Sequence, residues 1–312
     1  MELRQLRYLV AVVDEGGFTR AAARLHLAQP GLSAQIRQLE KELGQSLLDR
    51  SGRSVTPTEV GRAVLPYARA ALAAADAVRQ TVDEHTGLLR GKVTLGLVSG
   101  ATAHAFDVAA FLADFHASHP ALEIALTEDT SERMQAALLT GGIDVALLGP
   151  TTEEAPAGLS YRTVVDVPLG AAVAPGDPLL DPADRTAVPL AELRDRPLIC
   201  LPRGTGVRAA FERGCARAGF RPRVAFEAAS PQVLAQLAAR GLGVAVLPLG
   251  EEGDGVGGGL RALRLVGDGL RARIVLARPA AGPTSPAARA LLHRLGGALP
   301  DVPGNAGAGS PV

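Results

Sequence analysis

Residues 18–37 read FTRAAARLHLAQPGLSAQIR, and their spacing predicts two short helices joined by a tight turn. In each helix, apolar residues recur every three or four positions and therefore share one face. The two stripes comprise Phe18, Ala21, Ala22 and Leu25 in the first helix, and Leu32, Ile36, Leu39 and Leu43 in the second. Small alanines allow the close crossing of a helix-turn-helix, and the second helix keeps a polar face for a DNA groove. An ordinary amphipathic helix pair would show the same pattern.

The segment QSLLDRSGRSVTPTEVG, residues 45–61, predicts two short strands around a turn at Ser51 and Gly52. Arg50 and Arg53 flank that turn. A basic hairpin after a helix-turn-helix is typical of a wing that lies along the phosphate backbone or in the minor groove. The wing therefore favours DNA binding over the ordinary helix pair.

Residues 1–60 resemble the winged helix-turn-helix domain of LysR-type transcriptional regulators, densely and in the same order along the chain. The resemblance implies that the front of the second helix enters the major groove and that the start of the first helix contacts phosphates. The implied DNA-binding residues are Thr19, Arg20, Gln29, Pro30, Ser33 and Arg37, with Arg50 and Arg53 in the wing.

Three residues of this region depart from the family pattern. Ala28 stands where the family usually has a capping Ser, and Gly31 stands where it favours Ala. The lost cap and the added helix glycine each cost about 1 kcal/mol locally. Ala34 replaces a frequent Arg and removes a contact to DNA, so the half-site preference of relatives does not carry over.

Composition and charge fit a globular regulator. The 312 residues are 47% hydrophobic and 21% charged with a formal net charge of zero, which allows two or three domains. Three arginines and no acid lie between Gly17 and Gln38. No run is long enough to cross a membrane and the charged N-terminus lacks a signal-peptide core, so we expect a cytoplasmic protein with no membrane partner.

Residues 59–90 predict one long linker helix after the DNA-binding domain of residues 1–58. Its apolar stripe comprises Val60, Val64, Tyr67, Ala68, Ala71, Leu72, Ala75, Val78 and Val82. Thirty residues span roughly 45 Å. An exposed stripe of that length needs a partner, either an antiparallel second copy or the helix's own domain. The family resemblance implies a dimerisation helix, a hinge at Gly91 and commonly a tetramer.

Residues 91–300 alternate strands and helices, as a largely parallel sheet covered on both faces does. We expect strands at 92–98, 122–127, 144–149, 162–167, 169–174, 197–201, 223–227, 243–248, 260–266 and 273–279, and helices at 104–118, 132–139, 207–218, 232–239 and 285–299. The pattern is similar to the two-lobed, periplasmic-binding-protein-like effector domain of the LysR family. Lobe I then comprises residues 91–160 and 269–300, lobe II comprises residues 161–268, and residues 301–312 form a disordered tail.

Ligands of open α/β sheets gather at the carboxyl ends of strands, where helices begin. Backbone N–H groups and hydroxyls at these points suit a small anionic effector bearing a carboxylate. The expected effector-binding residues are Ser99, Gly100, Ala101, Thr102, Thr130, Ser131, Gly204, Thr205, Arg208 and Pro248. The alternative is that the hydroxyl residues only cap helices and form turns.

The sequence shows no catalytic constellation, no metal-ligand spacing and no cofactor motif, so we expect no enzymatic activity. Cys200 and Cys215 leave open a redox-sensing regulator, although Cys200 ends an apolar strand, where an inert thiol is commoner. A ligand-binding protein with a decayed DNA-binding domain is a further alternative. The prediction is an oligomeric LysR-type regulator whose partners are promoter DNA, an effector and RNA polymerase.

Overall fold

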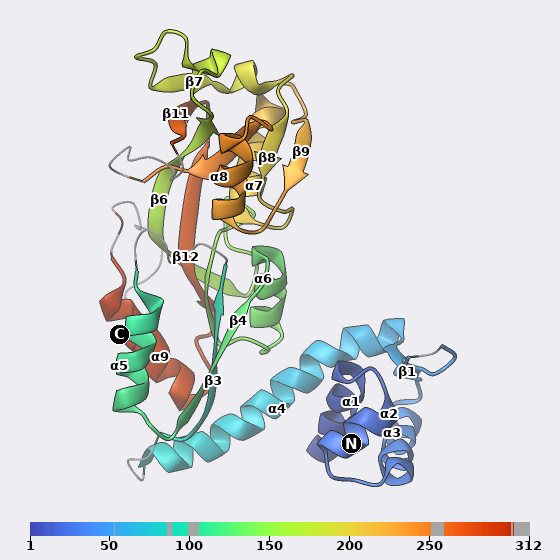
Figure 1. Cartoon of the computed structure of the whole chain (residues 1–312). Helices are drawn as coiled ribbons and strands as arrows, with labels where there is room; N and C mark the ends of the chain where they lie inside the picture. The colour runs from blue at the N-terminus through green and yellow to red at the C-terminus, as the bar shows by residue number, and fades with distance from the viewer. Residues whose placement is uncertain (53, 86–88, 99–105, 251–258, 301, 303–312) are drawn as a thin grey trace.

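The structure, a computed structural model, describes residues 1–52, 54–85, 89–98, 106–250, 259–300 and 302 (Figure 1). A small helical unit at the N-terminus leads through one long helix into an elongated α/β region. The predicted disordered tail lies outside the described residues except for Val302. The predicted fold class, a winged helix-turn-helix followed by a two-part α/β domain, is confirmed.

The N-terminal unit packs three helices and a short hairpin around one core. Its elements are α1 (Leu3–Asp14), α2 (Phe18–Arg24), α3 (Gln29–Leu43), β1 (Leu48–Asp49) and β2 (Thr56–Pro57). The core residues include Leu6, Leu9, Val12, Ala21, Ala22, Leu32, Ile36, Leu39 and Leu47. Helix α1, which the sequence analysis did not predict, contacts α2, α3 and α4 and so completes this core.

One residue of the apolar stripe predicted for the second helix, which is α3 in the structure, is exposed. Leu43 is 41% exposed, whereas Leu39 is fully buried one turn earlier. Helix α3 ends at Gly44, whose φ of 68° turns the chain away in the left-handed conformation that glycine tolerates. The expectation of a buried Leu43 was wrong because the helix extends one turn beyond the core.

Helix α4 (Glu59–His85) connects the N-terminal unit to the α/β region. Its first half packs on α1, where Leu65 and Ala68 are buried. Tyr67 and Val78 are 78% and 66% exposed. The long helix was predicted correctly, but its stripe divides into a face on its own domain and apolar residues that the single chain leaves uncovered.

A ten-stranded sheet runs through the whole α/β region in the order β4-β3-β5-β12-β6-β10-β8-β9, with β11 pairing β6 and β7. The strands are β3 (Gly91–Leu97), β4 (Leu122–Glu128), β5 (Val145–Leu148), β6 (Leu159–Val173), β7 (Ala187–Pro189), β8 (Leu198–Cys200), β9 (Val224–Glu227), β10 (Val244–Pro248), β11 (Arg261–Val266) and β12 (Arg271–Pro279). Strand β3 lies parallel to β4 and β5, and β8 lies parallel to β9 and β10. The antiparallel pair β6 and β12 joins these two parallel halves.

Helices cover both parallel halves of the sheet. They are α5 (Val108–Ser118), α6 (Ser131–Leu139), α7 (Gly206–Arg217), α8 (Pro231–Ala239) and α9 (Pro286–Ala298), with 3-10 turns η1 (Pro178–Leu180) and η2 (Leu190–Leu193). In the first half, α5 and α9 lie together on one face of the sheet and α6 lies on the other (Figure 1).

Strand β6 is continuous where two strands were expected. Its first part, up to Pro168, pairs with β12, and its second part, from Leu169, pairs with β10. Pro168 has no N–H to give to a ladder, so it is accommodated where the partner strand changes. The proline and the broken apolar pattern explain why the sequence suggested a break. The continuous strand makes β6 a rigid connection between the two halves.

Candidate functional site

The front of α3 presents a polar face to solvent. Gln29, Pro30 and Arg37 are exposed and Ser33 is half-buried. On the opposite face, Leu32, Ile36 and Leu39 are buried. Pro30 lies in the first turn, where its missing N–H breaks no helical hydrogen bond. Ala28 occupies the N-cap without a side-chain cap, as expected. The N–H groups of Gly31 and Leu32 donate to the Ala28 carbonyl, so this helix start offers its polar side chains outward.

The start of α2 lies beside the turn that precedes it. Thr19 and Arg20 are both exposed. The Nε of Arg20 donates a hydrogen bond to the carbonyl oxygen of Glu15 at 2.6 Å, and Arg24 pairs with the Glu15 carboxylate at 3.0 Å. These contacts hold two arginines along one exposed edge of the helix-turn-helix, with positive charge available to a phosphate.

The wing is attached to α3 by one carboxylate. Glu40 Oε1 accepts hydrogen bonds from the N–H groups of Leu47 and Leu48 at 3.0 and 3.2 Å, and Oε2 pairs with Arg50 at 2.6 Å. The Arg50 guanidinium also lies over the Phe18 ring, 5.3 Å from its centroid. Arg50 thus already has an acidic partner, although 36% of its side chain is exposed. Arg53 lies outside the described residues.

Two of the predicted effector clusters come together between the parallel halves of the sheet. Thr130 caps α6 by accepting a hydrogen bond from the Arg133 N–H at 3.4 Å. The Gly204 carbonyl accepts a hydrogen bond from the Glu132 N–H at 3.1 Å. Ser131 is fully buried, and its Oγ has no hydrogen-bond partner in the described part of the chain. A buried hydroxyl at the start of α6 suits a polar ligand, because an unpaired polar group is costly.

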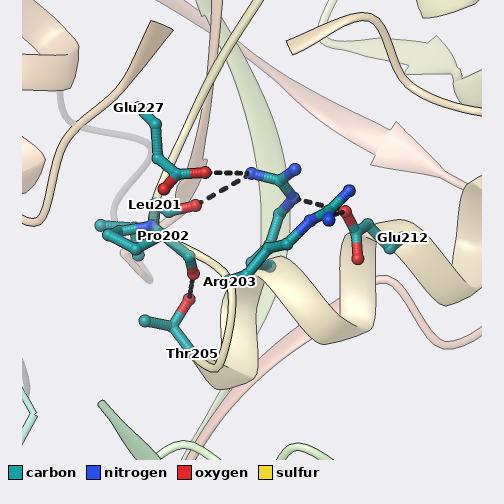
Figure 2. Close-up of polar contacts among 7 residues, drawn as sticks. Leu201, Pro202, Arg203, Thr205, Glu212 and Glu227 are labelled. Atoms are coloured by element: carbon teal, nitrogen blue, oxygen red, sulfur yellow. Dashed lines mark hydrogen bonds and ion pairs between the residues drawn. The ribbon is translucent and has the colours of Figure 1, made fainter.

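The backbones of the two halves approach each other closely beside this cluster. A Cβ added to Gly206 would lie 2.5 Å from the carbonyl carbon of Gly149. Glycine at position 206 is therefore required by space. Thr205 Oγ1 donates to the Pro202 carbonyl at 2.7 Å, so its hydroxyl holds the loop before α7 (Figure 2).

Arg208 is buried, and its partners Leu201, Glu212 and Glu227 are labelled in Figure 2. Its Nε donates to Glu212 at 2.8 Å, and its Nη1 donates to Glu227 and to the Leu201 carbonyl, both at 3.2 Å. A ligand carboxylate would compete with two carboxylates already present. The structure therefore uses Arg208 to tie the loop after β8 to the end of β9.

The other predicted effector residues are distributed differently. Pro248 ends β10, opposite Leu169 of β6. Ser99, Gly100, Ala101 and Thr102 lie outside the described residues. Glu40, Glu132 and Glu227 were not predicted, because no local pattern marks an acid whose partner lies on another element.

The two cysteine thiols are buried in the core of the second half. Burial raises the pKa of Cys200 and of Cys215 to about 12 in each case. The thiolate is the form that reacts with peroxide, and burial disfavours that form for both cysteines. These cysteines have the environment of structural thiols.

Neither a metal cluster nor a membrane-spanning helix occurs among the described residues. They contain no group of three or more His, Cys, Asp or Glu side chains placed to hold a metal ion. None of the helices in this part of the chain is both long and apolar enough to cross a membrane.

Comparison with known proteins gives concordant matches. The family model described as the LysR substrate binding domain matches residues 86–300, and that of the bacterial regulatory helix-turn-helix protein, lysR family, matches residues 3–62. The HTH-type transcriptional regulator AlsR of Bacillus subtilis is 33% identical over 80% of both chains. A probable hydrogen peroxide-inducible genes activator of Mycobacterium avium is 35% identical over 78% of this chain and 76% of its own.

Solved structures show the same architecture. A full-length OxyR variant from Pseudomonas aeruginosa superposes with a TM-score of 0.68 at 24% identity, covering 94% of this chain and 93% of its own. The LysR family regulator CbnR superposes with a TM-score of 0.61 at 23% identity, covering 96% of this chain and all of its own. At these identities the likeness supports the fold.

Proposed function

Because this chain belongs to the LysR family of transcriptional regulators, we propose that a small anionic effector, held between its two α/β lobes, modulates its binding to promoter DNA. The family is one of DNA-binding regulators and not of enzymes. The observation that carries the proposal is the contact of Gly204 with Thr130 and Glu132, which joins elements far apart in the sequence at the start of α6. We assign residues 91–160 and 269–300 to lobe I and residues 161–268 to lobe II.

The DNA-binding face is proposed to be the front of α3, with Gln29, Pro30, Ser33 and Arg37 in the major groove. Thr19, Arg20 and the wing arginines Arg50 and Arg53 then contact phosphates. The exposure of the α3 side chains and the basic edge of α2 support this assignment. An arginine that contacts a base contributes about 1–3 kcal/mol of discrimination.

The direct test is Arg37→Ala, measured by fluorescence anisotropy on the DNA upstream of the neighbouring gene. We expect operator affinity to fall roughly tenfold or more. Arg240→Ala is the matched control, because Arg240 is also an exposed arginine, at the end of α8 in lobe II. An affinity within about twofold of the parent would mean that α3 is misassigned. No specific shift by the parent, with or without effectors, would favour a decayed DNA-binding domain.

Self-association is proposed to occur through α4. Tyr67 and Val78 leave apolar surface on a helix that a second, antiparallel copy would cover. Tyr67→Glu should shift the dimer toward monomer in sedimentation velocity, whereas Glu59→Gln, at the exposed start of the same helix, should not. A Tyr67→Glu chain that sediments as the parent does would place the interface elsewhere.

Pairs of such dimers form the proposed tetramer, and a promoter-bound tetramer would contact RNA polymerase in the cytoplasm.

The effector is proposed to be a small carboxylate that binds at the start of α6. Helix N-termini and hydroxyls attract anions, and Ser131 Oγ has no partner in the described residues. Thr130→Val should weaken binding of the active carboxylate in calorimetry, whereas Thr140→Val, at the other end of α6, should not. A response only to uncharged or cationic compounds would contradict an anionic effector. Arg208 would then act indirectly, by positioning Gly204 and Thr205.

A redox sensor is the second candidate, because the Mycobacterium avium relative is named a probable hydrogen peroxide-inducible activator. The burial of Cys200 and Cys215 argues against it. Substituting either cysteine by serine should leave the peroxide response of the promoter unchanged.

A further inference from the structure

A hollow of about 300 Å³ lies on α7 and β12, and its lining shares no residue with the Thr130–Gly204 cluster. Four arginines face it, two from the helix and two from the strand. We call it the arginine pocket; its lining residues are Pro150, Thr152, Glu153, Gly206, Ala210, Arg213, Arg217, Gly269, Arg271 and Arg273. None of these residues belongs to the predicted DNA-binding or effector-binding sets.

The periodicity of the two elements brings the arginines together. Arg213 and Arg217 are four residues apart on α7 and so share one helix face. Arg271 and Arg273 are two residues apart on β12 and so point to the same side of the sheet. Two further lining residues on the same face of α7, Gly206 and Ala210, place no long side chain into the hollow.

The pocket has more positive than negative charge. Glu153 pairs with Arg217, and Asp166 pairs with Arg271 at 2.6 Å and with Arg273 at 3.7 Å. Four guanidinium groups against these two carboxylates leave a formal charge of +2. Like charges at close quarters are unfavourable unless an anion lies among them.

The positive charge of the pocket affects the pKa of Arg213. Burial lowers its pKa, and the neighbouring charges of Arg217 and Arg273 lower it further, against the opposing effect of Glu153. Its Nη1 donates to the Thr151 carbonyl at 2.5 Å, which fixes the guanidinium at the wall of the pocket. A fixed, partly desolvated guanidinium binds an oxyanion more strongly than a solvated one.

We propose that the arginine pocket binds the phosphate group of a small molecule, as a second ligand site of the regulator. A phosphate dianion matches the formal charge of +2, and the planar fork of arginine donates paired hydrogen bonds to phosphate oxygens. The volume is at the lower end of ordinary ligand pockets, which suits inorganic phosphate or a small phosphate ester. The site stands on its own contacts and does not depend on an effector at Thr130.

The position of the pocket gives this ligand a route to the first site. The Thr151 carbonyl receives Arg213, and the Thr151 hydroxyl hydrogen-bonds to Gln135 of α6 at 3.3 Å. Helices α6 and α7 therefore both connect the pocket to the Thr130–Gly204 cluster. A phosphate that draws α7 toward residues 150–153 would change how these helices meet at Gly204.

The test uses the full-length protein, free of DNA, in a buffer without phosphate or sulfate. Calorimetric titrations with inorganic phosphate, glycerol 3-phosphate and succinate are compared at constant ionic strength. We expect one saturable site per chain for the phosphate compounds, and affinity at least tenfold weaker for succinate. Tighter binding of glycerol 3-phosphate than of phosphate identifies an ester as the ligand, and the reverse order identifies the free anion.

Variants locate the binding. Arg273→Gln should weaken phosphate binding about tenfold or more, because a hydrogen bond to a charged group is lost. Arg273→Lys should fall between Arg273→Gln and the parent, since it keeps the charge but not the paired hydrogen bonds. Arg240→Gln and Arg37→Gln, which remove arginines outside the pocket, should bind as the parent does. Circular dichroism and melting temperature check that each variant folds.

Three results would overturn the proposal. They are the absence of saturable binding by the parent, equal affinity in Arg273→Gln, and succinate binding as tightly as phosphate. Loss of phosphate binding in Arg37→Gln would assign the ligand to the DNA-binding face instead. Thr130→Val should leave phosphate affinity unchanged, so a failure of the effector proposal and a failure of this one are separately visible.

Discussion

The attachment of the wing to α3 should depend on the Glu40 carboxylate. In Glu40→Ala the N–H groups of Leu47 and Leu48 lose their acceptor, and Arg50 loses its partner. Each hydrogen bond to a charged acceptor contributes about 1.5 kcal/mol, near the low end of the range for partly buried groups. The ion pair adds less than about 1 kcal/mol because Arg50 is 36% exposed. The two hydrogen bonds to the Leu47 and Leu48 amides therefore contribute about 3 kcal/mol together, before the ion pair is added.

Hydrogen exchange measures this loss locally. A decrease of about 3 kcal/mol in the opening free energy corresponds to roughly a hundredfold faster exchange of the Leu47 and Leu48 amides. Glu40→Gln keeps a carbonyl oxygen as an acceptor and loses only the charge, so we expect a change of about fivefold to tenfold. Because Arg50 is then free of its acidic neighbour, non-specific DNA affinity should rise and depend more steeply on salt.

The control is Glu42→Gln, which removes a carboxylate of the same helix that pairs with the N-terminal amine. It should leave exchange at residues 44–58 unchanged. If the Leu47 and Leu48 amides of Glu40→Ala exchange within about threefold of the parent rate, the carboxylate does not hold the wing and the reasoning fails.

Three further predictions concern the α/β region. Burial raises the pKa of Asp144, so the stability contributed by its protonated form is present at low pH and is lost as the pH rises through that raised pKa. Asp144→Asn should therefore flatten the pH dependence of stability above pH 4, and the variant should melt no lower than the parent at pH 7. With pKa values of about 12, Cys200 and Cys215 should react with a disulfide reagent only after unfolding, and labelling of the native protein within minutes would contradict this. Gly206→Ala should lower the melting temperature by several degrees, since overpacking costs about 1–3 kcal/mol, whereas Gly296→Ala, where a Cβ meets open space, should not. Equal melting temperatures for both variants and the parent would refute the close approach of Gly206 to Gly149.

Local patterns in the sequence predicted most of the elements, because periodicity and caps are encoded by neighbouring residues. Helix α6 begins at Ser131 after the capping Thr130, one residue before the predicted start. The exceptions include α1, whose apolar residues pack against α2, α3 and α4 together, and the three-residue strand β7, which pairs with β11. Strand β6 was divided at Pro168 because the sequence does not reveal a change of partner strand.

The positions of the candidate site residues could be predicted from the sequence, but the partners of their side chains could not. Placing Thr130 and Gly204 at strand ends was enough to expect both near a cleft, because the topology of α/β sheets determines where such ends lie. The roles of Arg208 and Arg50 were not predictable, because their partners Glu227 and Glu40 lie 19 and 10 residues away on other elements. The packing of α7 on β12, which brings the four arginines of the arginine pocket together, could likewise not be predicted from the sequence.

The geometry also gives a physical connection between the Thr130–Gly204 cluster, the proposed effector site, and the DNA-binding unit. Helix α6 begins at the cluster and ends at Thr140, and a Cβ on the next residue, Gly141, would lie 3.8 Å from the Cβ of Ala73 in α4. A nine-residue helix is about 13 Å long and moves as a rigid body. A ligand that shifts the start of α6 therefore also shifts its end against α4, the helix whose first half is packed into the DNA-binding unit. Since α4 also carries the exposed Tyr67 and Val78, the same displacement would alter the spacing of two paired DNA-binding units, which is the quantity that half-site recognition depends on.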